Sequence, residues 1–354
     1  MRISTSEPLQ TDAEQMLHTQ SDKSRVTAEP GGSLCISLDF ELMWGVRDKR
    51  TTDQYGANII GGREAVSQML DVFHRHNIRA TWATVGLLFC ETKDEMLASL
   101  PELQPTYADR QLSNYTYLDE VGDNEAKDPY HFAPSILAQI RACPGQEIAT
   151  HTFSHYYCLE PGQTRAQFSA DLDAAIKVAA RHGTTFKSIV FPRNQYDEGS
   201  VDECARRGIS TYRGNETSWM YQPGARAEQT LSRRAIRLAD SYVNLSGANT
   251  TSVTADRPVA NVRSSRFLRP FSRRLEKLES LRLSRITDSM TAAARRREMF
   301  HIWWHPHNMG ANQSENLAAL GHIIDHFEAL RGEHGMRSLA MEDFAPTDMR
   351  TCRK

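Results

Sequence analysis

The sequence has little of what marks a membrane protein, a nucleic-acid-binding protein or a disulfide-rich protein. No apolar run approaches the ~20 residues that cross a bilayer, and the net charge over 354 residues is only −2. The six cysteines form no Cys-x-x-Cys pair, which favours reduced thiols over a disulfide framework or a zinc knuckle. The N-terminal segment lacks the apolar centre of a secretory signal. We therefore expect a cytoplasmic protein that binds no nucleic acid.

The remaining composition is that of an ordinary globular protein, with 40% apolar and 24% charged residues. Residues 1–32 are polar and show no apolar periodicity, which predicts a flexible N-terminal tail. We expect a single domain over 33–345, interrupted by insertions at about 91–130 and 220–298. A C-terminal tail over 346–354 completes the predicted organisation.

Short apolar runs alternate with amphipathic helical stretches along this domain. The run 34–38 is followed by the helical pattern of 64–76 and by a second apolar run at 78–89, and strand–helix–strand is the signature of a parallel βαβ unit. Further strands are expected at 147–150, 187–191, 209–212, 300–304 and 336–340. The pattern predicts an α/β fold, a distorted (β/α) barrel of about seven parallel strands. A site would then form at the carboxyl ends of the strands.

Two histidines follow the strand predicted at 147–150. His151 and His155 are four residues apart, so their rings can reach one point if the chain turns helical there. Neutral imidazole is the commonest metal ligand in proteins. Paired histidines also occur on surfaces and as loop anchors, so the spacing alone leaves both interpretations open.

Two carboxylates follow the strand predicted at 34–38. Side chains alternate along a strand, so Asp39 and Glu41 face one way and Phe40 the other. Two carboxylates on one face are costly unless a cation lies between them. A functional role is favoured for Asp39, whereas Glu41 is equally compatible with the start of a solvated loop.

Polar residues also end two later strands. Arg193 and Asn194 follow 187–191, and His305 follows Trp303 and Trp304. Because adjacent strand residues point in opposite directions, at most one of the two tryptophans can face a site.

Two other regions carry weaker signals. Tyr130 closes the 91–130 stretch and either approaches the rim of the site or packs locally. Residues 263–297 hold eleven Lys and Arg against three Asp and Glu, an excess of eight. A solvated, salt-bridged helix on the outside of the barrel is favoured for this stretch. The alternative is contact with an anionic surface, either lipid headgroups at a membrane or a substrate diphosphate.

Four motifs resemble those of a known family, the polysaccharide deacetylases with the NodB homology domain (carbohydrate esterase family 4). The resemblance extends over about residues 33–345, and the two insertions are poorly matched. The motifs are Ser-Leu-Asp-Phe-Glu at 37–41, His-Thr-Phe-Ser-His at 151–155, Phe-Pro-Arg-Asn-Gln at 191–195 and Ile-Trp-Trp-His-Pro at 302–306.

The resemblance implies a NodB-like barrel and a metal-dependent deacetylase. It implies that Asp39 is the general base and that His151 and His155 bind one divalent ion, expected to be zinc. The family has adjacent aspartates in its first motif, whereas this chain has Phe40 at the second position. Glu41 is therefore expected as the third ligand.

The same resemblance assigns the remaining roles. Arg193 is expected to hold Asp39 ionised, and His305 to protonate the leaving amine. One of Trp303 and Trp304 is expected to line the acetyl pocket, with Asn194 and Tyr130 as further substrate contacts.

The predicted reaction is hydrolysis of an N-acetyl or N-formyl group on an amino sugar. A nucleotide-linked or lipid-linked saccharide precursor is the expected substrate of a cytoplasmic enzyme. Two alternatives remain open at this point: an amidohydrolase of small non-sugar amides, and a metal-free saccharide-binding protein.

Overall fold

The computed structural model describes residues 31–225, 228–253 and 258–346. The two predicted tails, 1–32 and 346–354, lie almost entirely outside the described residues. Among the described residues, no helix is both long and apolar enough to cross a membrane.

One parallel sheet forms the centre of the fold. Its strand order is β6-β5-β4-β3-β2-β1-β8-β7, and β9 also pairs with β1. β1 pairs with β2 through residues 37–40 and with β9 through residues 33–35, while β8 occupies its other edge. The strands are β1 (Ser33–Phe40), β2 (Ala80–Thr84), β3 (Gln146–Thr150), β4 (Ser188–Ile189), β5 (Thr211–Tyr212), β6 (Ala260–Asn261), β7 (Arg266–Phe267), β8 (Met299–Trp304) and β9 (Arg337–Leu339).

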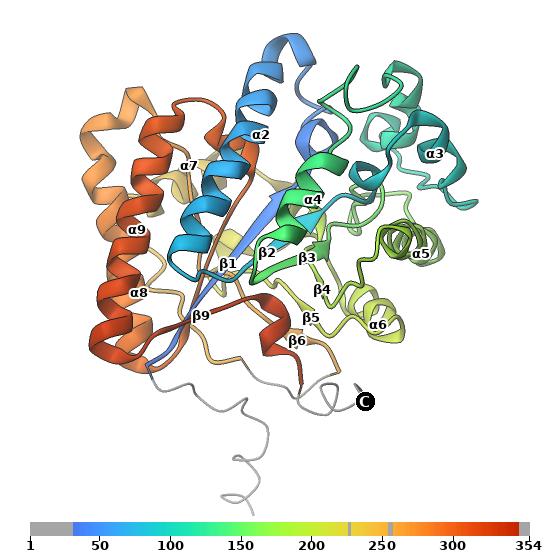
Figure 1. The fold of residues 1–354 in the computed structure, drawn as a ribbon. Helices are drawn as coiled ribbons and strands as arrows, with labels where there is room; N and C mark the ends of the chain where they lie inside the picture. Colours follow the sequence, from blue (N-terminus) through green and yellow to red (C-terminus); the bar gives the residue numbers. More distant parts are fainter. Residues whose placement is uncertain (1–30, 226–227, 254–257, 347–354) are drawn as a thin grey trace, which may run out of the picture.

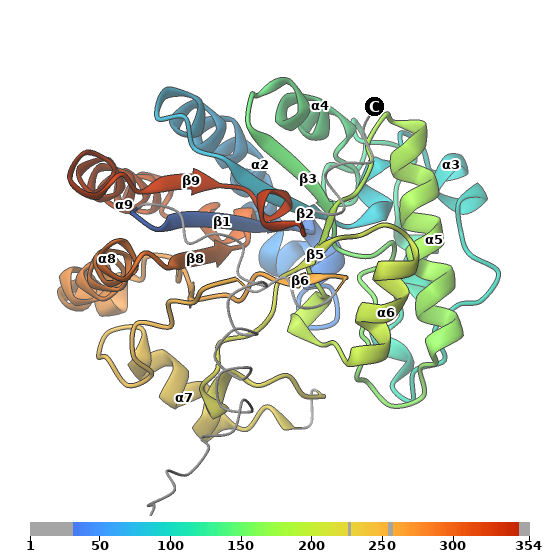
Figure 2. The ribbon, with the colours of Figure 1, turned by 90° about the horizontal axis from the view of Figure 1, so that it is seen from below.

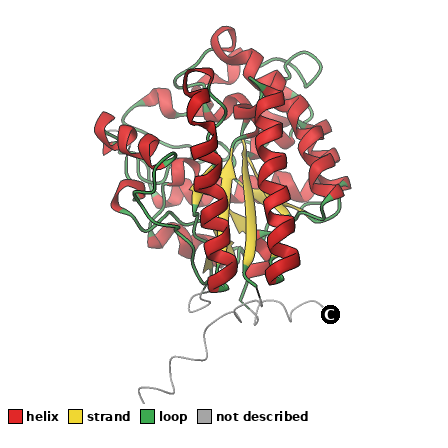
Figure 3. Ribbon diagram, turned by 90° about the vertical axis from the view of Figure 1, so that its left-hand side faces the viewer, coloured by secondary structure: helices red, strands yellow, loops and turns green. Residues whose placement is uncertain are grey.

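Helices surround this sheet, as expected for a distorted (β/α) barrel. Figure 1 shows α2, α4 and α9 against the central strands, and Figure 3 shows the strands enclosed by helices. In Figure 2, α7 lies apart, between α8 and α6. The helices are α2 (Thr52–Arg75), α3 (Lys93–Ala98), α4 (Pro134–Ala142), α5 (Arg165–Arg181), α6 (Glu198–Arg206), α7 (Leu231–Asp240), α8 (Glu279–Arg296) and α9 (Gln313–His334). The predicted fold class is therefore confirmed.

The sheet has nine strands where about seven were expected. The additional strands β6 and β7 are two residues long and lie inside 220–298, the stretch expected to be an insertion. The sequence pattern does not predict either of them. α8 belongs to the same stretch and packs on α9 and β8.

Helix α2 begins twelve residues before its predicted start, at Thr52, where the Thr51 side chain accepts a hydrogen bond from the Gln54 N–H. Gly61 and Gly62 lie inside this helix and let it approach the short helix η9 (Pro306–Met309) closely. A Cβ on Gly61 would lie 2.3 Å from the Gly310 carbonyl oxygen, and one on Gly62 would lie 2.5 Å from His307 Cα. The two glycines thus allow the segment after β8 to pack directly against α2.

The basic stretch 263–297 is mostly integrated into the fold. Ile286, Met290 and Ala293 on α8 are buried in the main core, whereas Leu281 is exposed. The Arg285 guanidinium is also buried and lies 3.5 Å from the Asp240 carboxylate. Helix α8 is therefore a packed barrel helix and not only a solvated one. Contact of this stretch with an anionic membrane, the alternative interpretation, stays a prediction.

Candidate active site

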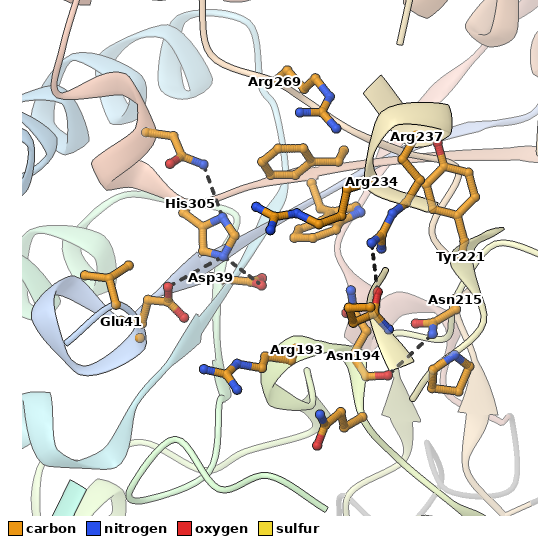
Figure 4. Close-up of a pocket in the computed structure, with 18 of the residues that line it drawn as sticks. Asp39, Glu41, Arg193, Asn194, Asn215, Tyr221, Arg234, Arg237, Arg269 and His305 are labelled. Carbon is orange, nitrogen blue, oxygen red and sulfur yellow. Dashed lines mark hydrogen bonds and ion pairs between the residues drawn. The ribbon is translucent and has the colours of Figure 1, made fainter. Parts of the chain in front are cut away.

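Side chains from the carboxyl ends of several strands line one cavity of about 870 Å³. Asp39 and Glu41 come from the end of β1, Asn194 from the segment after β4, and Trp303 and His305 from the end of β8. Figure 4 shows Asp39, Glu41 and His305 facing one another in this cavity. The position agrees with the location of ligand sites in parallel α/β barrels.

Glu41, His151 and His155 converge next to the cavity, which Glu41 and His155 line, and all three are buried. Their ligand atoms lie within 4.8 Å of one another. Glu41 Oε2 is 2.9 Å from His155 Nε2 and 3.4 Å from His151 Nε2. The structure therefore brings the three predicted metal ligands together.

The loop that carries the histidines is held by buried hydrogen bonds. Thr152 and His155 have positive φ angles of 65° and 60°, which are strained for residues with a Cβ. Asp171 of α5 accepts hydrogen bonds from the Phe153 N–H at 2.7 Å and from the Ser154 N–H. These contacts help to hold the loop in this conformation.

Each histidine presents its Nε2 atom to Glu41. The Nδ1 atom of His151 lies 2.7 Å from the Val190 carbonyl oxygen, and that of His155 lies 3.0 Å from the Tyr157 hydroxyl. The His151 Nε2 is buried without a hydrogen-bond partner. Burial lowers the pKa of His155 to about 4, against the opposing influence of Glu41, so its ring is neutral at pH 7. A metal ion binds the neutral form of an imidazole through its unprotonated nitrogen.

Glu41 fits its place because residue 45 has no side chain. The short helix η1 (Leu42–Gly45) turns back over Glu41, and a Cβ on Gly45 would lie 1.9 Å from the Glu41 Cδ. Burial alone would raise the pKa of Glu41, but His305 and His155 outweigh it and hold this pKa well below the usual value. The carboxylate is thus ionised. One carboxylate and two imidazoles suit a zinc-class divalent ion.

Arg213, which follows β5, holds the Asp39 carboxylate. Its two terminal nitrogens donate to Asp39 Oδ1 at 2.6 Å and Oδ2 at 2.8 Å, and both side chains are buried. Burial alone would raise the pKa of Asp39, but Arg213 and His151 outweigh it and lower this pKa. The predicted contact of Arg193 with Asp39 is therefore wrong.

Arg193 lies in the same cavity but has other partners. Its guanidinium is 2.5 Å from Asp48 and 3.8 Å from Glu160, and it lies over the Tyr157 ring. Arg213 also directly follows a short apolar strand, so the strand-end pattern could have suggested it. The pattern could not rank the two arginines, because both follow neighbouring strands.

His305 lies over both carboxylates and is partly exposed to the cavity. Its Nε2 is 3.6 Å from Glu41 Oε1 and 3.8 Å from Asp39 Oδ2, and Asn308 contacts its Nδ1 at 3.2 Å. The neighbouring His307 stacks on its ring and is buried. Burial, together with the nearby His305, lowers the pKa of His307 to about 3, which keeps that ring neutral.

The expected substrate contacts divide between the cavity and the core. Trp303 lines the cavity and stacks with the Arg213 guanidinium, 4.1 Å from its ring centre. Trp304 is 1% exposed and packs against Phe73, which makes it a core residue. Asn194 lines the cavity and accepts a hydrogen bond from Arg213. Tyr130 packs beside Gly56 and does not line this cavity, so its predicted contact with the substrate is wrong. Of the two tryptophans, of which at most one was expected to face the site, Trp303 is the one that does.

Comparison with solved structures establishes the fold. The fold is that of the polysaccharide deacetylases. A candidate polysaccharide deacetylase from Mycobacterium smegmatis matches with a TM-score of 0.55 and 12% identity, over 90% of this chain and 91% of its own. A probable polysaccharide deacetylase from Pseudomonas aeruginosa PAO1 matches with a TM-score of 0.51 and 12% identity, over 91% of both chains. No protein-family model and no curated protein matches the sequence. The resemblance based on motifs is thus confirmed at the level of the fold.

Proposed function

We propose that this protein is a metal-dependent hydrolase that removes an N-acyl group, expected to be acetyl, from an amino sugar. The convergence of Glu41, His151 and His155 beside the paired carboxylate of Asp39 carries this proposal. When bound there, a divalent ion would act as a Lewis acid on the amide carbonyl and make water more acidic.

Asp39 is the proposed general base. Because Arg213 binds both of its oxygens, the carboxylate stays ionised and fixed in direction. It accepts a proton from the water molecule whose oxygen attacks the acyl carbon. General-base assistance of this kind contributes about 10²–10⁴ in rate.

His305 is the proposed general acid. The C–N bond breaks as the carboxylic acid forms, and the amine leaves only if its nitrogen receives a proton. The His305 Nε2 faces both Asp39 and Glu41 and is open to the cavity, so it can donate that proton. The products are then a carboxylate and a free amino sugar.

Metal analysis of purified protein tests this function, with Glu41→Ala and His151→Ala as variants. We expect about one divalent ion per wild-type chain, much less in both variants, and acetate release that chelation abolishes. A wild-type protein without metal that still binds saccharides would support a binding protein instead. Metal-dependent hydrolysis of small amides, without hydrolysis of any N-acetyl sugar, would support a non-sugar amidohydrolase.

A further inference from the structure

Three arginines line the cavity on the side away from Glu41. Arg234 and Arg237 come from α7, and Arg269 lies two residues after β7. Figure 4 shows these three side chains around the part of the cavity that lies beyond His305 and Asp39. They come from the region 220–298, which the proposed hydrolytic mechanism does not use.

These arginines form no ion pair within the part of the chain that the structure describes. Arg237 donates to the side-chain oxygen of Gln229 at 2.8 Å, and Arg269 donates to the Ser241 hydroxyl at 2.7 Å. Both partners are uncharged. Arg266 also lines the cavity but, unlike these three, it forms an ion pair, since it lies 3.2 Å from the carboxylate of Asp240.

The arginines also repel one another, which bears on the pKa of Arg237. Burial lowers the pKa of this guanidinium, and the neighbouring Arg233, Arg269 and Arg234 lower it further. Arginine nevertheless stays protonated at neutral pH. The cavity therefore contains several positive charges that no carboxylate of the described chain offsets.

The acidic residues of the cavity do not neutralise these three arginines. Asp39 is bound by Arg213, and Glu41 by the histidines. Glu216 is buried beside the same cavity, and burial raises its pKa. Within the described residues no carboxylate is left to pair with Arg234, Arg237 and Arg269, so these side chains are available to an anionic ligand.

We propose that Arg234, Arg237 and Arg269 form a subsite for a phosphate or diphosphate group of the substrate. This inference rests on the proposed function and names its substrate class: an N-acyl amino sugar that bears a phosphate ester. A carboxylate offers two oxygens to one guanidinium, whereas a diphosphate offers enough oxygens and charge for three. The volume of about 870 Å³ lies in the upper part of the range of ligand pockets, ~300–1,000 Å³, and accommodates a sugar with such a substituent.

Inorganic pyrophosphate is the first probe. Its binding is measured by calorimetry on protein freed of metal, so that it cannot bind through a metal ion. Wild-type protein is compared with Arg234→Gln, Arg237→Gln and Arg296→Gln. Arg296 is an exposed arginine on α8 that does not line the cavity, so this control loses the same charge elsewhere.

We expect Arg234→Gln and Arg237→Gln each to raise the dissociation constant at least about tenfold, and Arg296→Gln to leave it within about twofold. Raising the salt concentration should weaken wild-type binding more than binding to the two cavity variants. Equal dissociation constants in all four proteins would overturn the subsite. This measurement needs no catalytic activity, so its outcome is independent of the proposed reaction.

Acyl release from three N-acetylglucosamine compounds then tests the substrate class. They are a nucleoside diphosphate sugar, a short-chain lipid diphosphate sugar and a neutral chitin oligomer. We expect a higher kcat/KM for at least one diphosphate compound than for the oligomer, and a ratio that falls about tenfold in Arg237→Gln. The preferred diphosphate compound shows whether the phosphate group of the substrate belongs to a nucleotide or to a lipid. A ratio that is the same in wild type and Arg237→Gln would overturn the assignment, whereas no acyl release at all, with pyrophosphate still bound, would count against the proposed function only.

Discussion

Replacing Gly45 with alanine should remove the metal without unfolding the protein. The added Cβ would lie 1.9 Å from Glu41 Cδ and 2.1 and 2.3 Å from its two oxygens. Nonbonded carbon atoms stay about 3.5 Å apart or more, so the carboxyl group has to move by more than 1 Å. Gly45 does not have a positive φ angle, so alanine fits its backbone.

The displaced group is the end of a flexible side chain, which is why the fold should survive. The same displacement separates Glu41 from the two histidine nitrogens, whose spacing with it is at most 4.8 Å. Disturbing even the residues that orient metal ligands costs about 10–100-fold in affinity, and here a ligand itself moves. We therefore expect metal affinity to fall at least about 100-fold.

The assay is competitive titration with a zinc chelator, together with thermal unfolding of the metal-free proteins. Gly321→Ala is the matched control, because it adds the same methyl group on α9 where no atom lies within 4 Å of the new Cβ. The control should bind metal as wild type does. Wild-type metal affinity in Gly45→Ala would refute the assignment of Glu41 as a ligand.

Three further predictions concern other buried groups. Arg213→Met should lower the unfolding free energy by about 3–5 kcal/mol, because it leaves the buried Asp39 carboxylate unpaired. Adding Asp39→Asn should restore much of that loss, as measured in denaturant titrations. If the losses of the two single variants simply add in the double variant, the pairing is contradicted. His305→Ala should lower kcat about 10²–10⁴-fold with metal content unchanged, whereas loss of metal would make His305 a ligand. Burial raises the pKa of Glu147 on β3 to about 7, so its contribution to stability is present below pH 4.5 and lost as pH rises through 7. Wild type should therefore lose up to about 3 kcal/mol relative to Glu147→Gln between pH 5 and pH 9, and parallel stability curves would disprove this.

The site could be predicted from the sequence to the extent that it depends on strand ends. Asp39, His151 and His305 each follow an apolar run, and parallel strands place their carboxyl ends at one edge of the sheet. Their convergence therefore follows from strand order and period. The position of Glu41 does not follow from them, because it depends on a turn over Gly45 that no periodicity describes.

The sequence by itself determined the parallel α/β class, the histidine pair and the acidic strand end, because these depend on local period and residue type. Only the tertiary structure decided that Arg213 and not Arg193 reaches Asp39, since neither β4 nor β5 pairs with β1 and the contact depends on how each side chain extends across the carboxyl edge of the sheet. It also decided that Trp303 faces the cavity while Trp304 enters the core. The grouping of arginines from α7 with Arg269 arises in the same way, from segments that are adjacent in space and distant in sequence.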